Sequence, residues 1–73
     1  MAKLPVLGCS EVVQTFVNLG WTIARTGNPV ILIREGSNVS LSVPNHKEVA
    51  RGTLRSLIRD AGVTVEEFIA AMA

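Results

Sequence analysis

The chain has 73 residues, 48% of them apolar and 18% charged, with a net charge of +1, one histidine and one cysteine. This length suits one small domain with a single core, and the apolar content excludes an intrinsically disordered chain. The small net charge excludes a general polyanion binder. One cysteine cannot form an internal disulfide, and with one histidine it cannot supply a four-ligand metal site. We therefore expect no metal and no other cofactor.

The sequence has no pattern typical of a secreted or membrane protein. Its start carries one lysine and no long apolar run, unlike a signal peptide. No stretch approaches the roughly 20 apolar residues of a membrane span. We expect a cytoplasmic protein in which Cys9 is a small buried apolar side chain.

Residues 1–8 are predicted to be extended, and a helix is predicted to follow with Ser10 as its N-cap and Gly20 after its last turn. The expected apolar side of this helix has Val12, Val13, Phe16, Val17 and Leu19, and the expected polar side has Glu11, Gln14, Thr15 and Asn18.

The hydrophobic period then changes from 3.6 to 2, which indicates strands. Residues 21–26 alternate as a half-buried strand does, and residues 30–33 form an apolar run typical of a central strand. In residues 39–43, valine and leucine alternate with serine, as in a third strand. Turn residues 27–29 and 35–38 separate the three strands, so the sequence predicts a three-stranded antiparallel meander that ends at Pro44.

The middle strand is apolar on both faces, whereas the serines place one face of the last strand in water. Either Val30 and Leu32 or Ile31 and Ile33 therefore lie on a face that the helices do not cover. Such a patch is either a site for a protein partner or ordinary exposed aliphatic surface.

A basic amphipathic helix is predicted from residue 53, or from Arg51, to residue 61, with Gly62 as the left-handed residue that ends it. Its apolar face has Leu54, Leu57, Ile58 and Ala61, and Arg51, Arg55 and Arg59 recur every four residues beside that face. Two readings remain open: a core helix with a solvated basic edge, or a cationic stripe for phosphate or an acidic protein.

Thr64 and Glu67 form a capping box for a short last helix, whose apolar side has Val65, Phe68, Ile69 and Met72. The predicted order is αβββαα. We expect an α+β fold with helices on one face of a three-stranded antiparallel sheet.

The order and the motifs resemble the HicA-like toxins, small mRNA interferases of toxin–antitoxin pairs. The resemblance is close over residues 35–69, EGSNVSLSVPNHKEVARGTLRSLIRDAGVTVEEFI, and weaker in CSEVVQTFVNLGW and RTGNPVIL. It implies that residues 1–73 form one HicA-like domain with a fold similar to double-stranded-RNA-binding domains. It also implies metal-independent mRNA cleavage and inhibition by a HicB-like antitoxin that covers the active surface.

One position departs from the family pattern. The family has Gly-Ser-His at the first hairpin, where the histidine is catalytic, and this chain has Gly27, Asn28 and Pro29. RNA cleavage by transesterification needs a base and an acid, and proline has no titratable side chain. The resemblance therefore implies a toxin scaffold with weak or no catalysis, or a non-enzymatic RNA- or protein-binding module.

His46, in the loop before the basic helix, is the remaining candidate catalytic residue. Its alternatives are an RNA contact or an ordinary loop histidine. Basic side chains are expected to form one RNA-binding surface with the first turn, and Lys3 joins it if the N-terminal segment folds back. The expected RNA-binding residues are Arg25, Gly27, Asn28, Arg34, Lys47, Arg51 and Arg55. Phe16 and Trp21 are predicted to lie in the core rather than to stack on bases.

Overall fold

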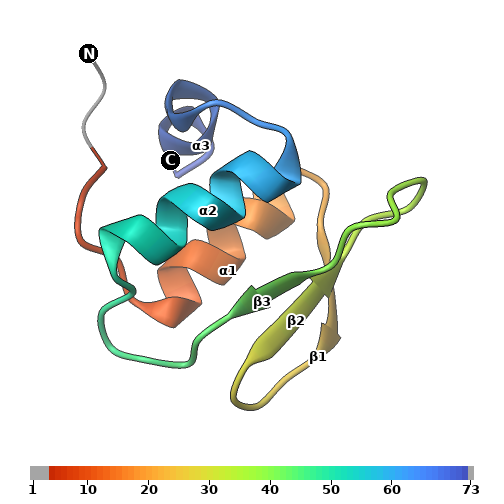
Figure 1. Ribbon diagram of the computed structural model, residues 1–73, viewed down its shortest axis with the longest axis horizontal. Coiled ribbons are helices and arrows are strands. Elements are labelled where there is room, and N and C mark those ends of the chain that lie inside the picture. Colours follow the sequence, from red (N-terminus) through yellow and green to blue (C-terminus); the bar gives the residue numbers. More distant parts are fainter. Residues whose placement is uncertain (1–3, 73) are drawn as a thin grey trace.

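The structure is a computed structural model that describes residues 4–72. Figure 1 shows its elements in the order α1 (Cys9–Asn18), β1 (Thr22–Arg25), β2 (Val30–Ile33), β3 (Leu41–Val43), α2 (Arg51–Ala61) and α3 (Val65–Ala70). The αβββαα order and the α+β class predicted from the sequence are confirmed. The double-stranded-RNA-binding-like description is consistent with this arrangement.

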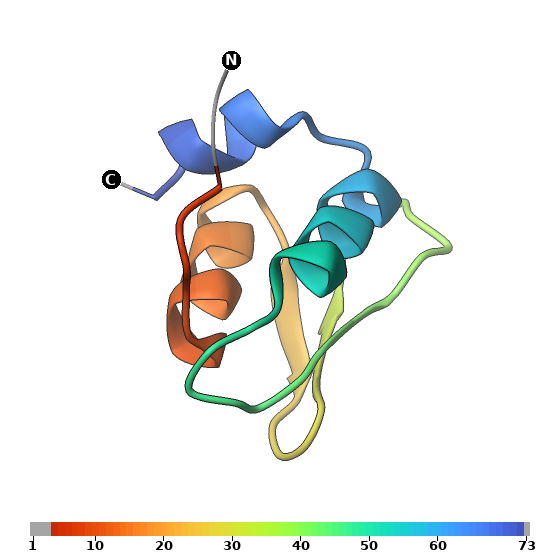
Figure 2. The ribbon, with the colours of Figure 1, turned by 60° about the vertical axis from the view of Figure 1, so that its left-hand side comes forward.

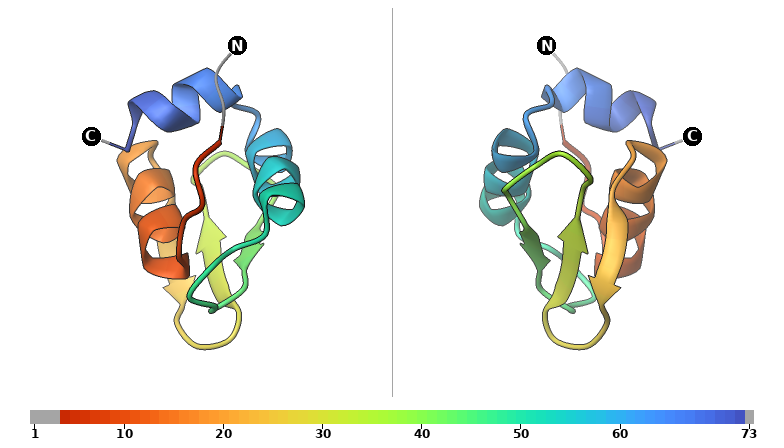
Figure 3. Two further views of the ribbon diagram at one scale, coloured as in Figure 1. Left: turned by 90° about the vertical axis from the view of Figure 1, so that its left-hand side faces the viewer. Right: turned by 90° about the vertical axis from the view of Figure 1, so that its right-hand side faces the viewer.

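The sheet is an antiparallel meander with β2 in the centre, as predicted. The helices lie on one face of it, and α3 crosses one end of the helical layer (Figures 2 and 3). Ile31 of β2 is opposite Arg25 of β1 and Ser42 of β3, and side chains of directly opposed residues point to the same face. Among the described residues, no helix lies on the other face of the sheet (Figure 3).

The core lies between the sheet and the helices. Val30 and Leu32 are buried there, whereas Ile31 is half-buried and Ile33 is 46% exposed. The face of the sheet that the helices do not cover is therefore the one with Ile31 and Ile33. The sequence had left open whether this face carries these two residues or Val30 and Leu32. Phe16 packs edge to face on Phe68 at 5.1 Å between ring centroids and so joins α1 to α3.

The segment before α1 is part of this core. It runs between α1 and α2 (Figure 3), where Leu4 and Leu7 are 1% and 4% exposed. Leu7 also forms a β-bridge with Val49, whose N–H donates to the Leu7 carbonyl at 2.7 Å. The sequence predicted an extended segment but gave no sign of this packing. The predicted burial of Cys9 is confirmed.

Three details of α1 differ from the prediction. Its N-cap is Gly8 and not Ser10, because Glu11 accepts the Gly8 N–H at 3.3 Å through Oε1 and so caps the first turn. Thr15 is buried and not on the polar side, because its hydroxyl donates to the Glu11 carbonyl at 2.8 Å and needs no solvent. Val17, predicted on the apolar side, is 36% exposed.

The first and third strands also differ. Of residues 21–26, predicted to be half-buried, only Trp21 is buried, and all four residues of β1 are exposed. β1 is an edge strand with an irregular register between Ile23 and Arg25, and the helical layer does not cover its side chains. β3 is shorter than predicted: Val39 is outside it and 43% exposed.

The two C-terminal helices agree with the prediction. α2 begins at Arg51 and buries Leu54, Leu57, Ile58 and Ala61, and Gly62 follows it with φ of 76°. In α3, Thr64 Oγ1 accepts the Glu67 N–H at 3.0 Å and Glu67 Oε1 accepts the Thr64 N–H at 2.9 Å. Met72, predicted in the last helix, lies in the turn after it. Within residues 4–72, no helix has the length and apolar character to cross a membrane.

Candidate functional site

Two loops lie side by side at one end of the sheet. The turn with Gly27, Asn28 and Pro29 joins β1 to β2, and the loop of residues 44–50 leaves β3 at the same end (Figures 2 and 3). The antiparallel order requires this, because the start of β2 is opposite the end of β3, with Val30 paired to Val43. Pro29 and His46, the two candidate catalytic positions predicted from the sequence, are thus in neighbouring loops.

Asn45 connects these loops directly. Its backbone N–H donates to Asn28 Oδ1 at 3.3 Å, and its side-chain Nδ2 donates to the Gly27 carbonyl at 3.0 Å. Gly27 has φ of 134°, a backbone conformation that favours glycine. Pro29 is exposed next to this connection.

The backbone of His46 is anchored on two sides. Its N–H donates to the Pro44 carbonyl at 2.9 Å, and its carbonyl accepts the N–H of Cys9, the first residue of α1, at 3.0 Å. The imidazole remains exposed. The loop and the start of α1 border an open pocket of about 390 Å³. Its lining residues are Gly8, Cys9, Ser10, Glu11, Asn45, His46 and Lys47.

Cys9 is not a reactive thiol in this pocket. Burial raises its pKa, so the thiolate, the nucleophilic form, is scarce at neutral pH. Within residues 4–72, no group of three or more His, Cys, Asp and Glu side chains is arranged to hold a metal ion.

The predicted RNA-binding residues are only partly brought together. Arg25 ends β1 beside the first turn and is exposed, and Lys47 is exposed in the neighbouring loop. Arg34 follows the opposite end of β2, five residues after Pro29, which corresponds to roughly 16 Å along a strand. Lys3 is outside the described residues.

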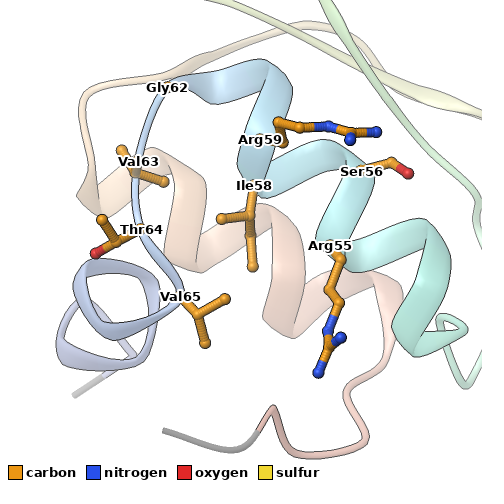
Figure 4. A pocket seen from close by; sticks show the side chains of 8 residues that line it. All are labelled: Arg55, Ser56, Ile58, Arg59, Gly62, Val63, Thr64 and Val65. Atoms are coloured by element: carbon orange, nitrogen blue, oxygen red, sulfur yellow. The ribbon is translucent and has the colours of Figure 1, made fainter. Parts of the chain in front are cut away.

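Arg51 and Arg55 are on α2. Arg51 is its first residue, at the end of the loop with His46, and Arg55 is one turn further along. Arg55 borders a second, shallow groove with Ser56, Ile58, Arg59, Gly62, Val63, Thr64 and Val65 (Figure 4). There the side chains of Arg55 and Arg59 point in different directions, with Ile58 between them (Figure 4).

Neither aromatic side chain considered for base stacking is available. Phe16 is fully buried and Trp21 is 3% exposed, so the prediction that they lie in the core is confirmed.

Comparison with protein families gives a match that spans most of the chain. The model of the HicA toxin of bacterial toxin–antitoxin systems matches residues 9–63, from the first residue of α1 to just after α2. The chain belongs to the HicA toxin family. The match includes both loops and the residues that connect them. Comparisons with curated proteins and with solved structures gave no match.

Asn45 is the site residue that sequence reasoning missed. It lies between Pro44 and His46 within residues 35–69, the stretch that most closely resembles HicA toxins. An asparagine after a strand-ending proline is typical of a turn. Nothing in the local sequence indicates that its partners are Gly27 and Asn28.

Proposed function

We propose that this HicA family member is an RNA-binding toxin scaffold whose metal-independent mRNA cleavage is weak or absent, because Pro29 occupies the position of the family's catalytic histidine. The observation that supports this is the connection through Asn45, which holds the turn with Pro29 against the loop with His46. Pro29 is exposed at the place where the fold would present a catalytic side chain to RNA.

The chemistry of RNA cleavage explains why the proposed activity is weak or absent. Internal transesterification removes the proton from a 2′-hydroxyl, forms the bond between that oxygen and phosphorus, and protonates the leaving 5′-oxygen. A positioned acid or base contributes roughly 10²- to 10⁴-fold to such proton transfers. Pro29 can neither accept nor donate the proton.

His46 is the one imidazole beside this position. We assign it an RNA contact in the present chain, with residual acid–base catalysis as the alternative. Its backbone bonds to Pro44 and Cys9 fix the loop, while the exposed ring can approach a phosphate.

The basic residues supply the electrostatic part of RNA binding in this proposal. Arg25 and Lys47 flank the two loops, and Arg51 begins the helix that follows. Gly27 and Asn28 would lie against the RNA backbone, and Arg55 and Arg34 would contact phosphates further from the cleavage position. We propose a HicB-like antitoxin as the protein partner that covers this surface in the cytoplasm.

A non-enzymatic binding module is the second candidate function. Two observations favour it: proline at position 29, and the helix-free sheet face, where Ile33 is 46% exposed. Such a protein would bind RNA or an antitoxin without cleaving RNA.

The deciding experiment compares the protein with its Pro29→His variant on a defined mRNA in buffer with a chelator. We expect cleavage by the variant to be about 10²- to 10⁴-fold faster, because the acid–base group is restored. Pro29→Ala is the matched control and should remain as slow as the unchanged protein. Equal cleavage by the unchanged protein and Pro29→His would contradict the proposal, and His46→Ala would then show whether His46 is the catalytic group.

A salt titration of RNA binding tests the basic surface separately. The slope of log affinity against log salt is negative, and each lost phosphate contact reduces its magnitude by about 0.7 for single-stranded RNA. We expect that decrease for Lys47→Ala, which lies in the loop with His46, and a smaller one for Arg34→Ala at the far end of β2. Equal slopes for Lys47→Ala and the unchanged protein would remove Lys47 from the RNA contact surface.

A further inference from the structure

We propose that Asn45 is a positioning residue that locks residue 29 against the loop of His46, and that Asn28 serves as its acceptor rather than as a contact for RNA bases. This inference rests on the proposed function, since position 29 matters only if it faces RNA. It changes the role predicted for Asn28 and adds a residue that the sequence did not single out.

Backbone hydrogen bonds hold the loop of residues 44–46 in place, so this loop can position the turn of residues 27–29. One of its bonds is internal, from the His46 N–H to the Pro44 carbonyl. Another connects it to α1, where the His46 carbonyl accepts the Cys9 N–H at 3.0 Å. The two bonds of Asn45 then attach the turn to a loop that is itself held by a helix.

The turn needs such an attachment because little else holds it. Gly27, Asn28 and Pro29 are all exposed, so no apolar packing fixes them. Glycine has the greatest backbone freedom of any residue, and Gly27 has φ of 134°. The side chain of Asn45 binds the carbonyl of this glycine, the residue of the turn with the greatest intrinsic backbone freedom.

Asn28 has a defined part in this connection. Its Oδ1 accepts the backbone N–H of Asn45 at 3.3 Å, and that oxygen is therefore occupied within the protein. The serine that the family has at this position carries its oxygen closer to the main chain.

The first test measures amide hydrogen exchange and does not depend on activity. Asn28→Ala removes the acceptor of the Asn45 N–H, and we expect exchange at Asn45 to become roughly tenfold faster, the size of one net hydrogen bond. Asn38, an exposed asparagine in the loop at the other end of the sheet, is the matched control. Asn38→Ala should leave exchange at Asn45 unchanged, and Asn28→Asp should restore slow exchange because it keeps an oxygen at the same place.

The second test measures cleavage in the Pro29→His background. Small misplacements of a catalytic group reduce rate by up to about 10²-fold. We expect Asn45→Ala to lower kcat at least tenfold with KM changed less than twofold, and Asn28→Ala to have a smaller effect in the same direction. The double variant should lower kcat further than either single variant, because Asn45→Ala removes only the bond to the Gly27 carbonyl and leaves the backbone bond to Asn28 in place. Asn28→Asp should keep kcat and raise KM, since its charge repels phosphate.

Unchanged exchange at Asn45 in Asn28→Ala would overturn the proposal. So would a pure KM effect of Asn45→Ala, which would make Asn45 an RNA contact. If Pro29→His cleaves no RNA, the proposed cleavage function fails. The connection between the loops is then supported or overturned by the exchange experiment alone, so the two failures are distinguishable.

Discussion

Single glycines decide how closely segments of this chain approach each other. A Cβ added at Gly8 would lie 2.7 Å from the backbone carbonyl oxygen of Lys47, a distance that real Cβ atoms do not reach. Gly8 therefore permits the start of α1 to lie against the loop with His46. Gly52, within α2, has nothing within 4 Å of such a Cβ.

We expect alanine to have opposite effects at these two positions. Gly8→Ala should destabilise the protein by more than about 1 kcal/mol, because backbone must move to remove the clash. Gly52→Ala should stabilise it by up to about 1 kcal/mol, because alanine loses less backbone entropy than glycine when it joins a helix. Thermal unfolding of both variants gives the answer, since 1 kcal/mol moves Tm by about 4–8 °C at this size. A lower Tm for Gly52→Ala would contradict this account.

Glycines that end a helix can be predicted from the neighbouring sequence, whereas a glycine that makes room for a segment far along the chain cannot. Gly62 follows a helical pattern, and its left-handed conformation was predicted correctly. Gly8 looked like part of an extended lead-in, because Lys47, the residue it must avoid, is far away along the chain. Asn45 was missed for the same reason.

At the scale of the element, α3 depends on its capping box and on one aromatic side chain. It has six residues, too few to form an isolated helix in water. Thr64 and Glu67 satisfy two N–H groups of its first turn, and Phe68 is fully buried against Phe16. The helix is therefore stable only when docked.

Thr64→Ala tests the cap. We expect a loss of about 1 kcal/mol in unfolding free energy, because the Glu67 N–H loses its acceptor. Thr53→Ala, an exposed threonine on α2, is the control and should be neutral or slightly stabilising. Urea unfolding of the two variants should separate them, and equal midpoints would mean that the cap contributes nothing.

Element type was predictable here, whereas burial was not always so. The period of two in residues 21–26 correctly indicated a strand, yet β1 is exposed throughout. Alternation reports which side chains share a face, and it does not report whether a helix lies above that face. α2 was predicted in full because its arginines and its apolar face both follow the helical period.

At the scale of the whole molecule, stability depends on one small core. A domain of this size is stable by roughly 4–11 kcal/mol. Phe68 and Phe16 are fully buried, and Leu4 in the segment before α1 is 1% exposed. Each large side chain therefore supplies a substantial fraction of the total.

Phe68→Ala is expected to cost about 3–5 kcal/mol, because it leaves a cavity between α1 and α3. That is a large fraction of the total stability, so the variant should be partly unfolded near 37 °C. Val17→Ala, at a position that is 36% exposed, is the matched control and should cost far less. Circular dichroism melts would show the difference. A cost near zero for Phe68→Ala would mean that α3 is not docked in solution.

The site was less predictable than the fold. Resemblance to HicA toxins pointed to position 29, which stays a prediction, and the helical period predicted the arginines of α2. Neither showed that Arg34 lies at the far end of β2 from Pro29, since that depends on how the strands are arranged. The connection through Asn45 requires three-dimensional structure, because it joins two loops separated by two strands.

The position of Trp21 has a practical consequence for spectroscopy. It is the only tryptophan, it is 3% exposed, and its ring meets that of Phe16 edge to face at 6.4 Å. Its indole Nε1 has no hydrogen-bond partner among the described residues. A tryptophan in such dry surroundings should emit at short wavelength. Because β1 separates it from Gly27, its emission should follow unfolding and stay constant when RNA is added under the proposed binding to the loops, so one fluorophore can distinguish denaturation from that binding.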